Sequence, residues 1–405
     1  MRARWNRWVD LLSTSFWFVP MVMLFLSGGL AWLLLYVDRR YDPGMKDALD
    51  WAYTGGPQGA RSLLSTIAGS MITAASVTFS LAAVALSISS QQYGSRVLRN
   101  FMRDKVTQVL LGTFVSTFLY SVLVVRTIRG TDISGGFVPS ISVTVAIGLA
   151  LASLVLLVYF IHHISTSIQA SHIVRVISED MGDSILRLYP GGSGDPAANP
   201  DRLRGLRERE SMSIASPRSG YLESLDVDEL LEVATHQDVV LEVVFKPGDH
   251  LVERDEIVRV WGAGQLPDKP IERIQNSFLF GGERTPLQDI RYQFQQLTEV
   301  VIRALSPGIN DPFTAVNGID ELTTGMALLA RQPRPNGERQ DRDGHLRLIL
   351  STPQVPEILE ESVGHIATYG AGDRFVMARL RRLLAIVAPD LHGENELRTL
   401  ARLRA

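Results

Sequence analysis

Four long apolar blocks near the start of the chain constrain its fold most. They cover about residues 16–37, 63–89, 106–125 and 138–161, and none of them contains Asp, Glu, Lys or Arg. As helices rising about 1.5 Å per residue, such blocks cross a hydrocarbon core of about 30 Å. The first block is also too long for the apolar part of a signal peptide. The sequence therefore predicts an α-helical membrane domain with four transmembrane helices.

The second block carries small and hydroxylated side chains at spacings of three and four residues. In a helix these positions share one face. Two interpretations remain open, because small residues allow helices to pack closely and because hydroxyl groups can line a polar path through the membrane. The candidate pore-lining residues are Ser62, Ser65, Gly69, Thr73, Ser76, Ser80, Ala83 and Ser87.

Basic side chains lie at both ends of this block, with Arg61 at one end and Arg96 and Arg99 at the other. If they face a path, these pore-mouth candidates would favour anions. The loop between the second and third spans is basic, as is the segment before the first span. Because an even number of spans puts both termini on one side, this distribution predicts cytoplasmic N- and C-termini.

We expect four regions in the chain. A transmembrane domain over 1–181 includes a cytoplasmic extension of the fourth helix, and a linker rich in Pro and Gly covers 182–213. A small β-rich domain is expected over 214–265 and a mainly helical cytoplasmic domain over 266–405. The whole is a membrane domain followed by a mixed α/β cytoplasmic region.

The β-rich segment also bears a resemblance. The stretches SGYLESLDVDELLEVA and VVFKPGDHLVERDEIVRVW resemble a barrel-sandwich domain of the biotinyl and lipoyl type. Such carriers bear their cofactor on a lysine at a hairpin tip, whereas residues 234–238 contain no lysine. We therefore expect the shape of a small barrel without a prosthetic group.

An amphipathic helix is predicted over about 287–303, with one buried apolar stripe and one wet face that includes Asp289 and Arg291. A new helix should start after it, with Asp311 as N-cap and Pro312 at the first helical position. The polar residues of this junction form either a structural motif or a sensor site. They are Arg303, Ser306, Gly308, Asn310, Asp311 and Pro312.

Several function classes find no support in the sequence. The chain has no cysteine, which excludes disulfides and thiolate catalysis. It lacks a P-loop, a dinucleotide glycine fingerprint, a nucleophile elbow and a zinc-protease helix. The net charge of −3 comes without a basic patch and argues against a nucleic-acid partner. We expect no catalytic activity, no cofactor and no metal site.

Two segments resemble one family. The stretch RALSPGINDPFTA over 303–315 and the stretch STIAGSMITAASVTFSLAAVALSISSQQYGSRVLRNFMRD over 65–104 are similar to the bacterial membrane-protein family called domain of unknown function 2254. The resemblance implies four membrane spans and a cytoplasmic C-terminal region in a bacterial envelope protein, which we expect in the inner membrane. It implies no substrate, cofactor or catalytic residue.

Two functions from different classes follow from these patterns. In the first, the chain is an oligomeric inner-membrane protein, channel-like or transport-related, with a polar second span and a cytoplasmic regulatory domain. In the second, it is a non-conducting membrane sensor or scaffold whose cytoplasmic domain binds a ligand or a partner protein. The expected partners are the lipid bilayer, further copies of the chain, and a small ion or ligand.

Overall fold

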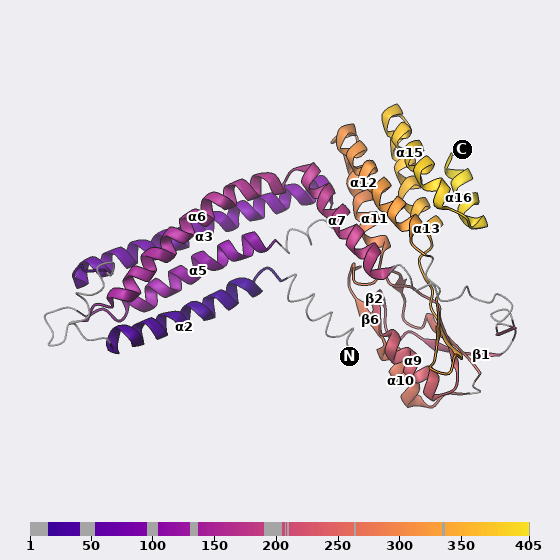
Figure 1. Cartoon of the computed structure of the whole chain (residues 1–405), viewed down its shortest axis with the longest axis horizontal. Helices are drawn as coiled ribbons and strands as arrows, with labels where there is room; N and C mark the ends of the chain where they lie inside the picture. The colour runs from indigo at the N-terminus through magenta and orange to yellow at the C-terminus, as the bar shows by residue number, and fades with distance from the viewer. Residues whose placement is uncertain are drawn as a thin grey trace. The chain divides into compact units, whose positions relative to one another are not determined.

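The protein is described from a computed structural model covering residues 15–40, 53–94, 104–129, 137–189, 205–206, 208, 210–262, 265–333 and 337–404. The chain divides into two compact units between Gln169 and Ala170. The N-terminal unit is helical, and the C-terminal unit contains both sheets and helices (Figure 1).

The N-terminal unit consists of α2 (Phe18–Arg40), α3 (Pro57–Tyr93), α5 (Lys105–Val125) and α6 (Ser140–Ser167). All four are long and apolar enough to cross a membrane, so the described residues contain the four apolar helices that the sequence predicted. Helix α5 is central and packs against the other three. Gly112 permits the close approach of α2, because an added Cβ would lie 2.6 Å from the Met23 sulfur.

Polar contacts tie the helices of this unit together near their ends. At the end of α2, Asp38 caps the start of α6: its carboxylate accepts from the Ile141 and Ser142 backbone amides, both at 3.0 Å. Beyond the other end of the bundle, Asp104 caps α5 and lies 3.0 Å from the His163 ring near the end of α6. These contacts fix the register of helices that are far apart in sequence.

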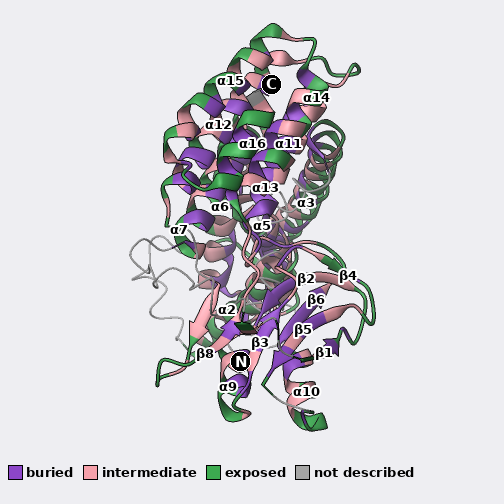
Figure 2. Ribbon diagram, turned by 90° about the vertical axis from the view of Figure 1, so that its right-hand side faces the viewer, coloured by how far each residue is buried: buried purple, intermediate pink, exposed green. Residues whose placement is uncertain are grey.

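The first part of the C-terminal unit contains two sheets (Figure 2). A five-stranded sheet has the order β1-β5-β3-β8-β7, and a three-stranded sheet has the order β4-β2-β6. The strands are β1 (Ser211–Ala215), β2 (Gly220–Leu225), β3 (Val240–Val243), β4 (His250–Leu251), β5 (Glu256–Trp261), β6 (Phe278–Gly281), β7 (Glu338–Gln340) and β8 (Leu346–Ile349). Helices α9 (Val227–His236) and α10 (Asp268–Asn276) pack against them.

The expected small barrel is not found, because the two sheets do not close on each other among the described residues. Strand β8 comes from much later in the chain and pairs with β3 in parallel, with Leu241 opposite Leu348. In addition, the stretch read as a hairpin tip at 234–238 includes the end of α9. Each sheet also contains a strand that lies beyond residue 265, where the β-rich domain was expected to end.

The second part of the C-terminal unit is a helical lobe. It contains α7 (Ala170–Leu188), α11 (Arg291–Ala304), α12 (Pro312–Arg331), α13 (Val355–Leu359), a π-helical turn η3 (Glu360–Gly364), α14 (His365–Gly370), α15 (Arg374–Val387), a 3₁₀ turn η4 (Ala388–Asp390) and α16 (Glu394–Arg404). The fourth span was expected to continue as a stalk to residue 181. Instead α6 ends at Ser167 and a separate helix, α7, begins at Ala170 in the other unit.

Helix α11 is the centre of this lobe and packs against α7, α12, α14 and η3. Its apolar stripe, with Phe294, Leu297 and Val301, is buried as expected. The expected wet face is wrong, because none of its residues is exposed and Asp289 and Arg291 are buried. A surface helix and a central helix with internal ion pairs have similar sequence patterns, and here neighbouring elements cover the polar side too.

Candidate functional site

The stripe on α3 lies open on the surface of the N-terminal unit. All eight candidate residues from Ser62 to Ser87 are exposed. At about 1.5 Å per residue they extend over about 38 Å, which exceeds the thickness of a hydrocarbon core of about 30 Å. The helices of the same unit therefore do not cover this polar face at any depth of the membrane.

Close packing uses the other side of the same helix. The buried face of α3 includes Ala60, Leu64, Ala68, Ala75 and Ala85, which contact the rest of the bundle. Small residues do mediate close helix contacts, as one interpretation of the sequence proposed, but they are the alanines and not the hydroxyl stripe. The alanines at spacings of seven, eight and ten residues were a signal that the sequence analysis missed.

Three hydroxyl groups of the stripe donate their hydrogens to carbonyls within the helix. Thr73 donates to the Gly69 carbonyl and Ser76 donates to the Ile72 carbonyl, each at 2.9 Å. Ser80 donates to the Ser76 carbonyl, also at 2.9 Å. A hydroxyl oxygen that donates in this way keeps its acceptor lone pairs. The stripe thus offers acceptors to its surroundings, which suit water or another hydrogen-bond donor.

A shallow hollow of about 610 Å³ runs beside the stripe. Leu157 of α6 borders it, and the α3 residues that line it include two members of the stripe. These α3 residues are Thr66, Gly69, Ser70, Thr73, Ala74 and Val77. The exposed polar face is therefore indented near its middle.

The pore-mouth candidates are only partly described. The Arg61 guanidinium donates to the Ile128 carbonyl at 2.7 Å, so it helps to hold α3 against the end of α5. Arg96 and Arg99 lie outside the described residues. The expected anion preference therefore stays a prediction.

The polar junction after α11 is a helix start, as expected. The Asp311 carboxylate accepts from the Thr314 amide at 3.1 Å and from the Thr314 hydroxyl at 2.5 Å, and Pro312 is the first residue of α12. These hydrogen bonds from Thr314 lower the pKa of Asp311 below its ordinary value. Asn310 takes the left-handed conformation, with φ of 48°, and turns the chain between the two helices.

The remaining junction residues lie around this turn. Ser306 donates to the Arg303 carbonyl at 2.6 Å, and Arg303 forms an ion pair with Glu299 on its own helix at 3.3 Å. Gly308 is exposed and has open space around it. The junction is thus a helix-to-helix turn in which Arg303, Ser306 and Asp311 make local polar contacts.

A group of buried charged side chains lies between the sheets and the helical lobe. Asp289 is fully buried, and one of its oxygens accepts from the Arg284 guanidinium at 2.5 Å and 2.9 Å. Arg291 is 9 % exposed and reaches Asp249 at 2.5 Å and Glu361 of η3 at 3.6 Å. Burial raises the pKa of Asp289 despite its two arginine neighbours. We call Arg284, Asp289, Arg291, Asp249 and Glu361 the buried charge network.

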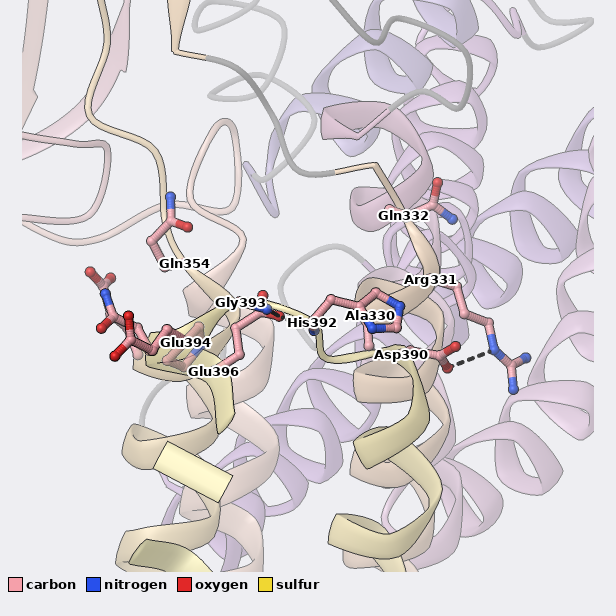
Figure 3. Close-up of a pocket in the computed structure, with 12 residues that line it drawn as sticks. Ala330, Arg331, Gln332, Gln354, Asp390, His392, Gly393, Glu394 and Glu396 are labelled. Carbon is pink, nitrogen blue, oxygen red and sulfur yellow. Dashed lines mark hydrogen bonds and ion pairs between the residues drawn. The ribbon is translucent and has the colours of Figure 1, made fainter. Parts of the chain in front are cut away.

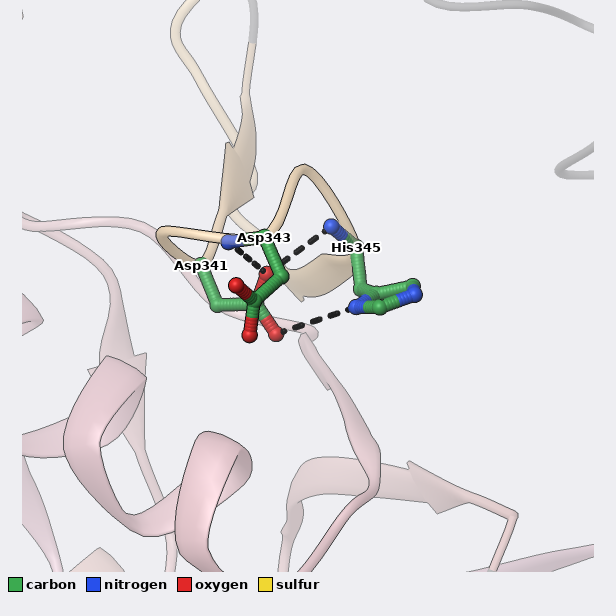
Figure 4. Close-up of side chains that lie close together, drawn as sticks. All are labelled: Asp341, Asp343 and His345. Carbon is green, nitrogen blue, oxygen red and sulfur yellow. Dashed lines mark hydrogen bonds and ion pairs between the residues drawn. The ribbon is translucent and has the colours of Figure 1, made fainter.

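An acidic turn between β7 and β8 brings Asp341, Asp343 and His345 together (Figure 4). Their potential ligand atoms lie within 4.8 Å of one another. Asp341 pairs with Arg347 at 2.7 Å and accepts from the His345 and Asp343 amides; the bond from Arg347 most of all, and then the amides, lower the pKa of Asp341 to about 2. The cluster is therefore explained as a tight turn closed by one carboxylate.

The helical lobe contains a hollow of about 770 Å³ where α12, α13 and α16 approach one another (Figure 3). Arg331 and Asp390 form an ion pair of 3.2 Å at its edge, and Glu396 accepts from the His392 and Gly393 amides. The lining residues are Ala330, Arg331, Gln332, Gln354, Pro356, Glu357, Asp390, His392, Gly393, Glu394, Asn395 and Glu396. The mixed charges of this lining would suit a polar ligand.

Comparison with known sequences decides the family. A family model described as a predicted membrane protein (DUF2254) matches residues 13–386. The chain belongs to this family. The four apolar helices and the junction motif at 303–315 are thus features of a DUF2254 member.

Two of the relatives come from mycobacteria. The chain is 32% identical over 342 residues to the uncharacterized protein Rv1290c of Mycobacterium tuberculosis and to the uncharacterized protein Mb1321c of Mycobacterium bovis. The match covers 84% of this chain and 65% of each relative, so the chain spans just under two thirds of their length. No solved structure matches the chain. The family assignment supports a membrane protein and leaves the activity to the argument from geometry.

Proposed function

We propose that the chain assembles into an oligomeric, channel-like or transport-related membrane protein in which α3 lines or flanks a polar path. The observation that carries the proposal is the exposure of the whole stripe from Ser62 to Ser87 over about 38 Å. A packed anchor would cover this face with helices of the same copy, whereas the helices of the N-terminal unit leave it exposed.

The physical argument concerns what touches the open face. A polar face gains nothing from hydrocarbon, so membrane helices turn such a face toward protein or water. Within one copy the alanine face of α3 already makes the helix contacts. A second copy, a water-filled path between copies, or both would satisfy the hydroxyl oxygens.

In this proposal the C-terminal unit is a regulatory part and not an enzyme, and the partners are further copies and a small ion. Inner-membrane location with both termini in the cytoplasm completes the proposal, supported by the basic segments at 2–7 and 96–105. The expected anion preference depends on Arg61, Arg96 and Arg99, of which Arg96 and Arg99 lie outside the described residues, whereas the acceptor oxygens of the stripe favour cations. Reversal potentials would tell which group dominates.

A second candidate is a non-conducting sensor or scaffold. The polar hollow between α12, α13 and α16 favours it, because its lining offers both charges to a ligand. In that case ligand occupancy would shift α7, which packs on α11 and α12.

Single-channel recording of the purified full chain in planar bilayers tests the proposal. We expect a discrete conductance that Ser76→Leu or Ser80→Leu reduces, because leucine removes a hydroxyl and adds bulk to the path. Ser76→Ala keeps the space open and should reduce the conductance less. Leu81→Phe adds bulk to another exposed part of α3 and should leave it unchanged.

Two outcomes would end the proposal. One is silence across voltage, membrane tension and pH from protein that circular dichroism and light scattering find folded and oligomeric. The other is a conductance that responds equally to all four substitutions, since the path would then not follow the stripe. Silence would favour the sensor or scaffold.

A further inference from the structure

Three helices of the C-terminal unit run in the same direction and begin at one end of the lobe. Helices α7 and α12 are parallel, because the Ser178 hydroxyl meets Glu321 at 2.6 Å and Met181 packs against Gly325 one turn later. Their register places Phe313, eight residues before Glu321, level with Ala170 at the start of α7. The beginning of α12 thus lies beside the point where the chain enters the lobe.

Helix α15 shares this direction. Asp320 of α12 lies 3.4 Å from Arg379 of α15, and Arg331 at the end of α12 lies 3.2 Å from Asp390 of η4, the turn that directly follows α15, so the two helices run in the same direction. Figure 1 shows α12 and α15 beginning side by side. Phe313 is therefore also level with the turn that precedes α15.

Large apolar side chains are exposed at this common end. Phe313 is 86% exposed, Phe375 is 63%, Tyr369 is 62% and Ile309 is 42%. The turn between α14 and α15 lies beside the turn between α11 and α12, since a Cβ on Gly370 would lie 3.4 Å from the Leu305 side chain. We call Ile309, Phe313, Tyr369 and Phe375 the apolar tip.

The acidic side chains at the tip contact backbone amides, whereas the basic side chain contacts an aromatic ring. Asp311 and Asp373 are helix caps whose carboxylates accept from backbone amides. Arg374 is exposed and lies 4.9 Å above the Phe375 ring. A long basic side chain beside an aromatic ring is the combination found where proteins meet a bilayer surface, because the ring enters the apolar boundary and the cation reaches the phosphates.

The connection to the fourth span limits how far this end is from the membrane. The apolar block of α6 ends near Ile161, and α7 begins at Ala170. Nine residues of helical rise span about 14 Å, and the headgroup region on one side of the hydrocarbon is about 5–8 Å thick. The chain connection therefore allows the start of α7 to lie close to the headgroups, and the start of α12 with Phe313 is level with the start of α7.

We propose that the apolar tip inserts into the headgroup and acyl-chain boundary of the membrane that the chain spans. It thereby ties the C-terminal unit to the bilayer at a second point besides the covalent connection at 168–169. The family motif at 303–315 supplies two of the four tip residues, and its turn presents them to the lipid. This inference is independent of whether α3 conducts.

Site-specific labelling tests the proposal directly, because the chain has no cysteine of its own. Phe313→Cys and Phe375→Cys would each carry an environment-sensitive nitrobenzoxadiazole label on the full chain in lipid nanodiscs. Leu186→Cys and Val252→Cys are matched controls, because both residues are similarly exposed on the same unit, at 56% and 55%. Leu186 lies on α7, sixteen residues from the end that carries the tip.

We expect the labels at 313 and 375 to be quenched by lipids brominated on the acyl chain and protected from iodide in solution, with blue-shifted emission. The labels at 186 and 252 should show the reverse. Iodide quenching at 313 and 375 equal to the controls would overturn the proposal. Protection from iodide without bromine quenching would overturn it as well, since protein and not lipid would then cover the tip.

Discussion

The buried charge network offers a sharp test of what holds the C-terminal unit together. Replacing Asp289 by Ala removes a carboxylate that is fully buried and that accepts from the Arg284 guanidinium and from the Arg291 amide. Both arginines stay in place, and Arg284 is only 13% exposed. The substitution therefore leaves buried positive charge with too few acceptors.

The size of the effect follows from the partners that remain. Removing one member of a buried ion pair costs about 3–5 kcal/mol. Arg291 keeps Asp249 at 2.5 Å and Glu361 at 3.6 Å, and Arg284 keeps Gln295. We therefore expect the lower end, a loss of about 3 kcal/mol. For a unit of this size that loss lowers Tm by roughly 6–12 °C.

Scanning calorimetry of the full chain in detergent micelles would measure the loss. Glu394→Ala is the control, because Glu394 pairs with Arg398 on the surface of α16, where both side chains are more than 70% exposed. Such exposed pairs contribute about 0–1 kcal/mol. A loss below about 1 kcal/mol for Asp289→Ala, similar to the control, would refute the reasoning that the network is a buried clamp.

Three further predictions concern other parts of the chain. Gly318→Ala should destabilise the protein by about 1–2 kcal/mol, because the new Cβ on α12 would clash with Val301. Gly182→Ala should stabilise the protein by about 0.5–1 kcal/mol, because Gly182 has open space around it. Thermal unfolding would compare the two variants, and changes of the same sign would contradict the packing argument. Asp341→Asn removes a carboxylate whose pKa is lowered from 3.8 to about 2. The wild type should therefore be more stable than the variant above pH 4 and lose this advantage as the pH falls toward 2. Urea titrations across that pH range would measure the difference in stability, and a difference that does not change with pH would contradict the prediction. Asp38→Ala should cost about 1 kcal/mol by removing the cap of α6, measured as a lower Tm in micelles, and an unchanged Tm would show that the cap is dispensable.

Local patterns were sufficient for the membrane helices and the helix starts. Four charge-free blocks predicted four spans, because any segment in lipid must satisfy its backbone internally and shield its charges. Asp311 and Pro312 predicted the start of α12 because a cap acts within one helical turn. These features depend on neighbours in sequence, so a single sequence contains them fully.

Contacts between distant segments were not predictable in this way. The pairing of β3 with β8 joins residues about a hundred positions apart, and the structure has two sheets where a small barrel was expected. Asp289 and Arg291 were placed on a wet face because their spacing is that of a surface helix, yet η3 and the turn at Asp249 cover them. Spacing gives the relative directions of side chains but not what lies opposite each direction.

The stripe on α3 illustrates the division best. The sequence by itself determined that Ser62 to Ser87 share one helix face within a membrane span, because helical geometry fixes the angle between successive residues. Only the tertiary structure decided that this face points away from the bundle while the alanine face contacts α5 and α6. The stripe and the buried alanines are both small residues, so the size of the side chains alone does not say which of them faces the neighbouring helices.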